Sequence, residues 1–227
     1  MLFRSGDYEE AASNFERAID YARISVTPRA ESLSLASLGD LYRDLDANQE
    51  ALDVYRQANA IARQMDDGYL LFYLDMAEGI LYRIAGDYAK ADSSFTTARK
   101  KAVDSNSPYN TSLLSLEKAL LQLAQGQYQK AYDAAENAYI YFKSEGNQNE
   151  SLRSAFCCTL ALAARGERDQ ALDYLAPVLP SLLENSYATP LIVQAREFKE
   201  ILRSITGKHE LKRQFNRILE RVETFEE

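Results

Sequence analysis

Residues that could carry out catalysis are few in this chain. His209 is the only histidine among the 227 residues, so a histidine triad, a histidine-rich metal site and an HExxH helix are all excluded. The two cysteines, Cys157 and Cys158, are adjacent in an apolar segment, where we expect them to behave as small hydrophobic residues. The sequence has no GxxxxGKS/T or GxGxxG motif and no nucleophile paired with a base. We therefore expect no enzymatic activity, no metal and no cofactor.

One group of charged residues has a spacing that suggests contact with a ligand. Asp75 and Glu78 are three residues apart in a segment with helical periodicity, and Arg83 follows. Because an unpaired carboxylate in a protein interior is unfavourable, these acids either contact a ligand, form ion pairs, or lie on a helix that is rotated to expose them. Lys118 is the candidate ion-pair partner of Glu78. These alternatives stay open on the sequence alone.

Composition and charge exclude several classes of protein. The chain is 46% hydrophobic and 26% charged, which is typical of a globular protein, and its formal net charge is −8. An acidic chain is a poor candidate for direct nucleic-acid binding, in which neutralisation of phosphates supplies much of the affinity. No apolar run reaches the roughly 18 residues of a membrane span, and the first residues do not resemble a signal peptide. Together with the adjacent cysteines, these features predict a reducing, cytoplasmic location.

A fixed period along the sequence organises the elements that must position these side chains. One column of the repeat holds small or apolar residues at Ala11, Ala51, Ala91, Ala131, Ala171 and Leu211. Four residues further on, a second column holds Phe15, Tyr55, Phe95, Ala135, Leu175 and Phe215. The interval survives all five steps without an insertion, which indicates an array of repeated units.

Each unit has the pattern of a helix–turn–helix. Apolar residues recur at helical spacing, a turn residue such as Gly86 or Gly126 follows, and a second helix carries small and aromatic residues on one face. Glycine is favoured at the left-handed position that ends a helix. The loops between units hold Pro28 and Pro108, which we expect near helix starts. Since no strand pattern of useful length occurs, the prediction is an all-α protein.

These residues resemble the tetratricopeptide repeat (TPR) family. The signature is clearest in GDYEEA at 6–11, followed by Phe15, and in GDY at 86–88, followed by Phe95. The step from Ala11 to Ala51 is longer than the usual period of the family, and the chain has no tryptophan. Long-period repeats of this kind are similar to the MalT-like, LuxR-associated regions of bacterial transcription regulators and to peptide-sensing domains of Gram-positive bacteria. The resemblance implies a right-handed α-solenoid whose first helices line the concave side, where partners bind.

The ends of the repeat array give further expectations. We expect a single domain over residues 1–227 with about six units and a capping helix pair at 189–227, with its helices over 191–205 and 208–225. Leu2 falls where later units are near the end of a first helix, so the first unit is expected to be incomplete and the chain to be a fragment of a longer polypeptide. Pro177 and Pro180 lie inside the second helix of the fifth unit and should end or kink it.

The family pattern places a set of apolar residues on the inward side of units three to five. They are Tyr73, Met76, Ile80, Leu113, Leu116, Leu120, Phe156 and Leu160. One interpretation is a groove for an amphipathic helix or a hydrophobic peptide. The other is that the longer helices are rotated and these residues pack the core. Asp75, Glu78 and Arg83 complete the candidate binding set.

The functional expectation is a non-catalytic scaffold that binds a protein or peptide, as part of a bacterial signalling or transcription regulator. The alternative is a small-ligand sensing domain of such a regulator, with Asp75, Glu78 and Arg83 at the ligand. Self-association through the first unit or the last helix pair is also possible on this pattern. Between Arg196 and Arg221 the chain carries eight basic and four acidic residues, which could meet an acidic second copy.

Overall fold

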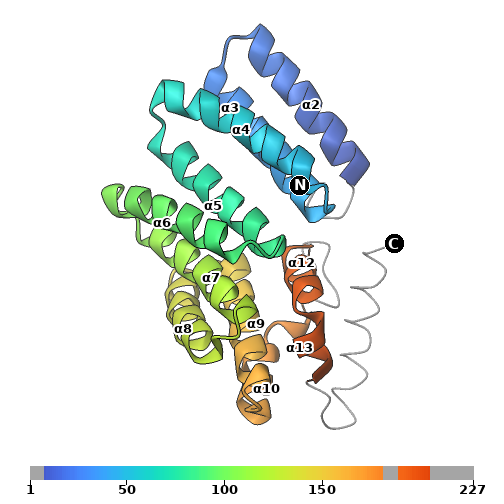
Figure 1. The fold of residues 1–227 in the computed structure, drawn as a ribbon, viewed down its shortest axis with the longest axis vertical. Helices are drawn as coiled ribbons and strands as arrows, with labels where there is room; N and C mark the ends of the chain where they lie inside the picture. The colour runs from blue at the N-terminus through green and yellow to red at the C-terminus, as the bar shows by residue number, and fades with distance from the viewer. Residues whose placement is uncertain (1–7, 181–188, 205–227) are drawn as a thin grey trace. The chain divides into compact units, whose positions relative to one another are not determined.

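The computed structural model describes residues 8–180 and 189–204, and helix is its only regular secondary structure in those ranges (Figure 1). The helices are α2 (Tyr8–Ile24), α3 (Pro28–Asp44), α4 (Asn48–Met65), α5 (Gly68–Ile84), α6 (Tyr88–Asp104), α7 (Pro108–Ala124), α8 (Tyr128–Ser144), α9 (Gln148–Ala164), α10 (Arg168–Leu175), α12 (Thr189–Glu197) and α13 (Lys199–Ser204). The predicted all-α fold of helical hairpins is confirmed. None of the helices in the described ranges combines the length and the apolar character that crossing a bilayer requires.

The helices follow a strict register along the chain. From α2 to α10 their first residues are evenly spaced, at Tyr8, Pro28, Asn48, Gly68, Tyr88, Pro108, Tyr128, Gln148 and Arg168. Two such helices make one repeat, whose length equals the step from Ala11 to Ala51, so the predicted period is confirmed. Pro28 and Pro108 are the first residues of α3 and α7, where a missing N–H leaves no intrahelical bond unmade.

The turns between helices repeat with the same register. A residue with positive φ, between 49° and 83°, occurs at Val26, Asp46, Asp66, Gly86, Asn106, Gly126, Gly146 and Gly166. The amide after it bonds the carbonyl five residues back, as in Asp87 N to Tyr82 O at 2.9 Å. This is the Schellman closure, which favours glycine, asparagine or aspartate at the left-handed position. The prediction that Gly86, Gly126 and Gly166 end helices is confirmed, and Val26 is the exception in residue type.

Two helices begin with an aspartate cap. Asp67 accepts a hydrogen bond from Leu70 N at the start of α5, at 3.1 Å, and Asp87 accepts one from Lys90 N at the start of α6, at 3.2 Å. Asp67 also receives Arg29 Nε from the preceding hairpin at 2.8 Å. The Leu70 amide, followed by Arg29, holds the pKa of Asp67 below its usual value. Asp67 therefore caps α5 and ties its start to the first helix of the preceding hairpin.

We expect Asp67→Ala to lower the free energy of unfolding at pH 7 by about 1 kcal/mol, the usual cost of losing a helix cap. Because the folded pKa is depressed, this contribution is complete above the unfolded pKa of about 3.9 and disappears as pH falls through the folded pKa. Urea unfolding of both proteins at pH 7 and at low pH measures the difference. A difference that persists unchanged at pH 2 would contradict this role.

The seam between paired helices depends on a small residue facing a large one. Tyr55 of α4 and Phe95 of α6 are fully buried. A Cβ at Gly39 of α3 would lie 2.4 Å from Tyr55 Cε1, and one at Gly79 of α5 would lie 2.5 Å from Phe95 Cε1. In the next repeat Ala119 and Ala135 hold the two equivalent positions, and both are buried. Glycine thus makes room for the aromatic ring of the same hairpin.

The chain divides into two compact units, residues 1–114 and 115–227. Helices α2 to α6 belong to the first unit and α8 to α13 to the second. In the second unit α10 ends at Leu175, two residues before Pro177, as the proline predicts. The helix expected over 191–205 is instead interrupted at Phe198, with no proline or glycine to account for the break. Residues 1–7, the expected last helix Lys208–Phe225 and His209 lie outside the described residues, so the expected incomplete first unit and capping pair stay predictions.

Candidate functional site

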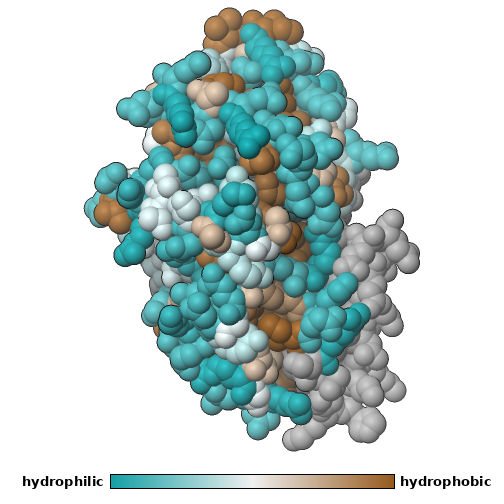
Figure 2. Space-filling view, in the orientation of Figure 1, coloured by the Kyte–Doolittle hydropathy of each residue, from teal (hydrophilic) through white to brown (hydrophobic). Residues whose placement is uncertain are grey.

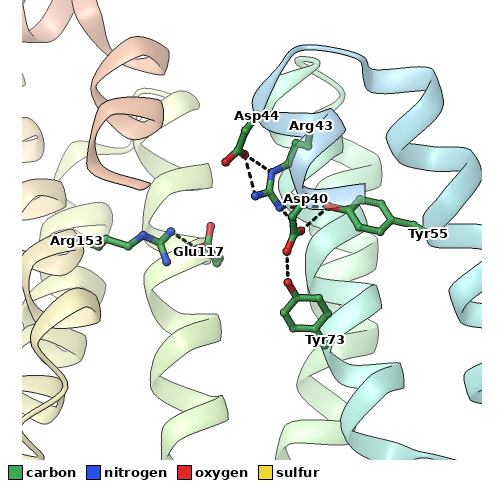
Figure 3. Close-up of polar contacts among 7 residues, drawn as sticks. All are labelled: Asp40, Arg43, Asp44, Tyr55, Tyr73, Glu117 and Arg153. Carbon is green, nitrogen blue, oxygen red and sulfur yellow. Dashed lines mark hydrogen bonds and ion pairs between the residues drawn. The ribbon is translucent and has the colours of Figure 1, made fainter. Parts of the chain in front are cut away.

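A cluster of polar side chains joins three helices in the first unit (Figure 3). Asp40 of α3 accepts hydrogen bonds at Oδ1 from Tyr55 Oη of α4, at 2.6 Å, and from Arg43 Nη1, at 2.8 Å. Its other oxygen, Oδ2, accepts from Tyr73 Oη of α5. Arg43 donates from Nε and Nη2 to Asp44 Oδ1 at 3.0 and 2.9 Å. This network, here called the Asp40 cluster, holds the first helices of two successive hairpins together.

The protonation states of the side chains in the Asp40 cluster suit a structural role better than a catalytic one. Burial raises the pKa of Tyr55 and of Tyr73 well above the usual value, and the Asp40 carboxylate adds to the effect. Burial alone would lower the pKa of Arg43, but Tyr55, Asp44 and Asp40 outweigh it and the pKa is raised. The tyrosines therefore stay protonated donors and Arg43 stays charged, so none of these three groups exchanges a proton near neutral pH.

The candidate binding residues of α5 lie on two different sides of the helix. Tyr73 and Ile80 are seven residues apart, which is about two helical turns and places them on one face. Asp75 and Glu78 are rotated by roughly 140° to 200° from Tyr73 at about 100° per residue. All four side chains are half-buried. They do not converge on one site, and the acidic pair is separate from the apolar pair.

Asp75 and Glu78 differ in their partners. Asp75 forms an ion pair with Lys101 of α6, so it is neutralised within its own hairpin. Glu78 forms no hydrogen bond or ion pair with any residue between 8 and 114. Burial is the main cause that raises its pKa, and the nearby Asp75 adds to the effect. The ion-pair interpretation thus holds for Asp75, with Lys101 as the partner. Lys118 belongs to the other compact unit, and its pairing with Glu78 stays a prediction.

Several of the other candidates are interior residues. Met76 and Arg83 are each 4% exposed, Leu116 and Phe156 are 0% exposed, and Leu120 is 1% exposed. Their burial favours the second interpretation of the apolar set, in which these positions pack between helices. Among the candidates, Tyr73, Ile80 and Leu113 are the apolar residues that keep some accessible surface. A role of this set in partner binding stays a prediction.

A second polar contact lies in the unit of residues 115–227. Glu117 of α7 is 1% exposed and accepts from Arg153 Nη2 of α9 at 2.5 Å (Figure 3). Gln194 Nε2 of α12 donates to the Arg153 carbonyl at 3.3 Å. The sequence carries a signal for this contact, because the equivalent positions of the other repeats hold small residues such as Ala77 and Cys157. A carboxylate at a repeat position that is otherwise occupied by small, buried residues requires a cation nearby.

Tyrosines join α8 to α10 in the same unit. Glu136 Oε1 accepts from Tyr132 Oη at 2.5 Å and from Tyr174 Oη at 2.6 Å, and these bonds lower the pKa of Glu136. The rings of Tyr132 and Tyr174 meet edge to face with centroids 6.0 Å apart. Cys157 and Cys158 are fully buried and free, and burial raises the pKa of the Cys158 thiol. These groups contribute packing and hydrogen bonds, and Cys158 is a poor nucleophile.

Comparison with known proteins identifies the class of repeat. Residues 1–64 match the family model of the tetratricopeptide repeat, and residues 84–165 match the model described as anaphase-promoting complex subunit 5. The first of these matches indicates a likeness to tetratricopeptide repeats, a family of helical hairpins that commonly mediate binding between proteins. No curated protein sequence is similar enough to count as a relative. The crystal structure of BtubC (BKLC) from P. vanneervenii is similar over 96% of this chain and 90% of that one, with a TM-score of 0.63 and 15% identity, which shows a shared fold alone.

Proposed function

We propose that the chain is a non-catalytic scaffold that binds a protein or peptide partner through the first helices of residues 1–114. The observation that carries the proposal is a partly exposed surface formed by two successive first helices, on which Leu33 is exposed and the other three residues are half-buried. Leu33, which is 37% exposed, and Asp40 lie two turns apart on α3, and Tyr73 and Ile80 lie two turns apart on α5. The hydrogen bond from Tyr73 to Asp40 joins the two pairs. We call these four residues the first-helix surface.

The chemistry of the first-helix surface suits an amphipathic partner. Leu33 and Ile80 offer apolar contact, while Asp40 and Tyr73 between them are polar and fixed by the Asp40 cluster. An amphipathic helix or an extended peptide with apolar anchors uses this combination, burying its apolar residues beside polar groups that set its register. Since Asp40, Arg43 and Asp44 together carry one net negative charge, a partner with a basic residue next to its apolar anchors fits best.

The wider setting that we propose is a cytoplasmic signalling or transcription regulator of a bacterium. Its support is the long period of the repeat, which resembles that of the sensor regions of MalT-like and LuxR-associated regulators. In such a regulator the repeats would couple recognition of a partner to a neighbouring module.

Sensing of a small effector is the second candidate, and Glu78 is the observation that favours it. This carboxylate is half-buried, and burial and Asp75 raise its pKa against the opposing effect of Arg56 and Arg63. It has no hydrogen bond or ion pair with a described residue of its own unit. A ligand with a cationic or hydrogen-bond-donating group would supply that partner. At 100 times its dissociation constant such a ligand should stabilise the protein by about 2.7 kcal/mol, which a thermal-shift screen of cationic metabolites with Glu78→Gln as the control detects.

Partner capture with a matched pair of variants tests the proposal. We expect Leu33→Glu, which places a charge on the first-helix surface, to reduce the amount of captured partner at least tenfold. Ile140→Glu is the control, because Ile140 is 60% exposed on α8 of the other unit and its replacement leaves the surface intact. Circular dichroism checks that both variants are folded. Equal capture by the two variants, or capture of no specific partner by the wild-type chain, would count against the proposal.

A further inference from the structure

The end of α2 and the turn that joins it to α3 expose three large apolar side chains. Val26 is 82% exposed, Ile24 is 78% exposed and Tyr21 is 62% exposed. Figure 2 shows hydrophobic side chains at the top of the view, where Figure 1 places the α2–α3 turn. We call these three residues the turn patch. Singly exposed apolar residues are common on proteins, but three within six residues at the end of a helix are more typical of a binding surface.

Val26 is also unfavourable for the backbone that it occupies. Its φ is +52°, in the left-handed region, where a β-branched residue is a genuine outlier. The equivalent positions of the following turns hold Asp46, Asp66, Gly86 and Asn106, which suit that conformation. A residue that is strained and exposed at once stabilises neither the turn nor the core. A contact between the Val26 side chain and another molecule would account for a valine at this strained position.

Two ion pairs lie beside the turn patch. Arg23 Nε donates to Glu31 Oε1 at 2.7 Å, and Arg29 Nε donates to Asp67 Oδ2 at 2.8 Å. The two arginine side chains are themselves 51% and 60% exposed. An apolar centre with a rim of arginines and paired acids is the usual anatomy of a protein interface. The charges at this rim nearly balance, because Arg17, Arg23 and Arg29 stand against Asp20, Glu31 and Asp67. Two copies of the patch can therefore meet without the repulsion that the net charge of −8 imposes elsewhere.

We propose that the turn patch is a self-association surface, at which two copies of this chain pair with each other. The three apolar side chains offer roughly 400 Å² of accessible area, within the range of the largest patch on a monomer. Two copies that bury this area together with the surrounding arginines reach about 1,000 Å², the lower limit for a specific interface. The expected product is a weak dimer with a two-fold axis at the patch, in which Val26 of each copy contacts the patch of the other.

Sedimentation velocity of the full chain over a hundredfold range of concentration tests the proposal. We expect a reversible monomer–dimer equilibrium that Ile24→Asp weakens at least tenfold and that the matched variant Ile140→Asp leaves unchanged. A chain that stays monomeric at all concentrations, or a dimer that both variants weaken equally, would overturn the proposal. Loss of this dimer would leave partner capture through the first-helix surface intact, so the two proposals fail separately.

Val26→Gly separates a binding role from a structural one, because the two predict opposite results. Glycine relieves the left-handed backbone, so the thermal midpoint of the diluted monomer should rise, while the dimer should weaken at least tenfold. A variant that is more stable and dimerises as well as the wild type would overturn the proposal. Ser25→Cys gives a direct check, since the two native cysteines are buried: oxidation should cross-link the dimer through the turn, and failure to cross-link at dimer-forming concentrations would contradict it.

Discussion

Gly39→Ala is expected to lower the free energy of unfolding of residues 1–114 by about 2–3 kcal/mol, the upper range for overpacking a core. The added Cβ would lie 2.4 Å from Cε1 of Tyr55, and real Cβ contacts are essentially never that close. Tyr55 is fully buried and its hydroxyl is fixed by Asp40 and Arg43, so the ring cannot swing away. Urea unfolding followed by circular dichroism measures the loss.

Two comparisons isolate the clash from the general effect of alanine in a helix. Gly68→Ala, at the start of α5, places a Cβ with no atom within 4 Å and should be neutral or stabilising. In a Tyr55→Ala background, which removes the ring, Gly39→Ala should become stabilising by up to about 1 kcal/mol because alanine is the better helix former. Ala119 and Ala135, two repeats further along the chain, show that a pair of alanines fits this position. A loss of the same size with and without the Tyr55 ring would refute the explanation.

Arg43→Met is expected to cost about 3 kcal/mol, at the lower end for breaking a buried ion pair by removing one partner. The substitution keeps the aliphatic length but removes the cation that Asp40 and Asp44 share. The side chains of Arg43 and Asp40 are each 14% exposed and that of Asp44 is 6% exposed, so water replaces little of the lost interaction.

Arg56→Met provides the matched control for Arg43→Met. Arg56 is 61% exposed and pairs with Asp53 at 3.6 Å, and such surface pairs contribute about 0–1 kcal/mol. Thermal and urea unfolding should therefore separate the two variants clearly. If Arg43→Met and Arg56→Met destabilise the protein equally, the Asp40 cluster does not hold the first helices together in the way described.

The repeat register could be predicted from sequence because each hairpin carries the same small and aromatic residues. The column from Ala11 to Ala171 is buried throughout, and the glycines at 86, 126 and 166 adopt the left-handed conformation. The pairing of Gly39 with Tyr55 was not predicted, although Gly79 repeats it with Phe95 in the following hairpin. Recognising it requires the relative rotation of the two helices, which the spacing of residues along one helix does not provide.

The candidate binding residues were harder to predict for a physical reason. An apolar residue at helical spacing has the same sequence pattern whether it faces a groove or a neighbouring helix. Leu116 and Phe156 proved to be buried, while Tyr73 and Ile80 keep partial exposure. The Asp40 cluster combines α3, α4 and α5, so its geometry depends on how three helices pack. Tyr55 and Tyr73, the tyrosine partners of Asp40, lie on two other helices, so the spacing along α3 could not predict them.

Site-specific photo-cross-linking tests the central claim, that the first helices of residues 1–114 form the partner-binding surface. A photoreactive amino acid at position 33 or 80 of the full chain should cross-link to the captured partner. The same group at position 140, which is exposed on the other unit, should give only background labelling. Efficient cross-linking from position 140 with none from positions 33 and 80 would contradict the account.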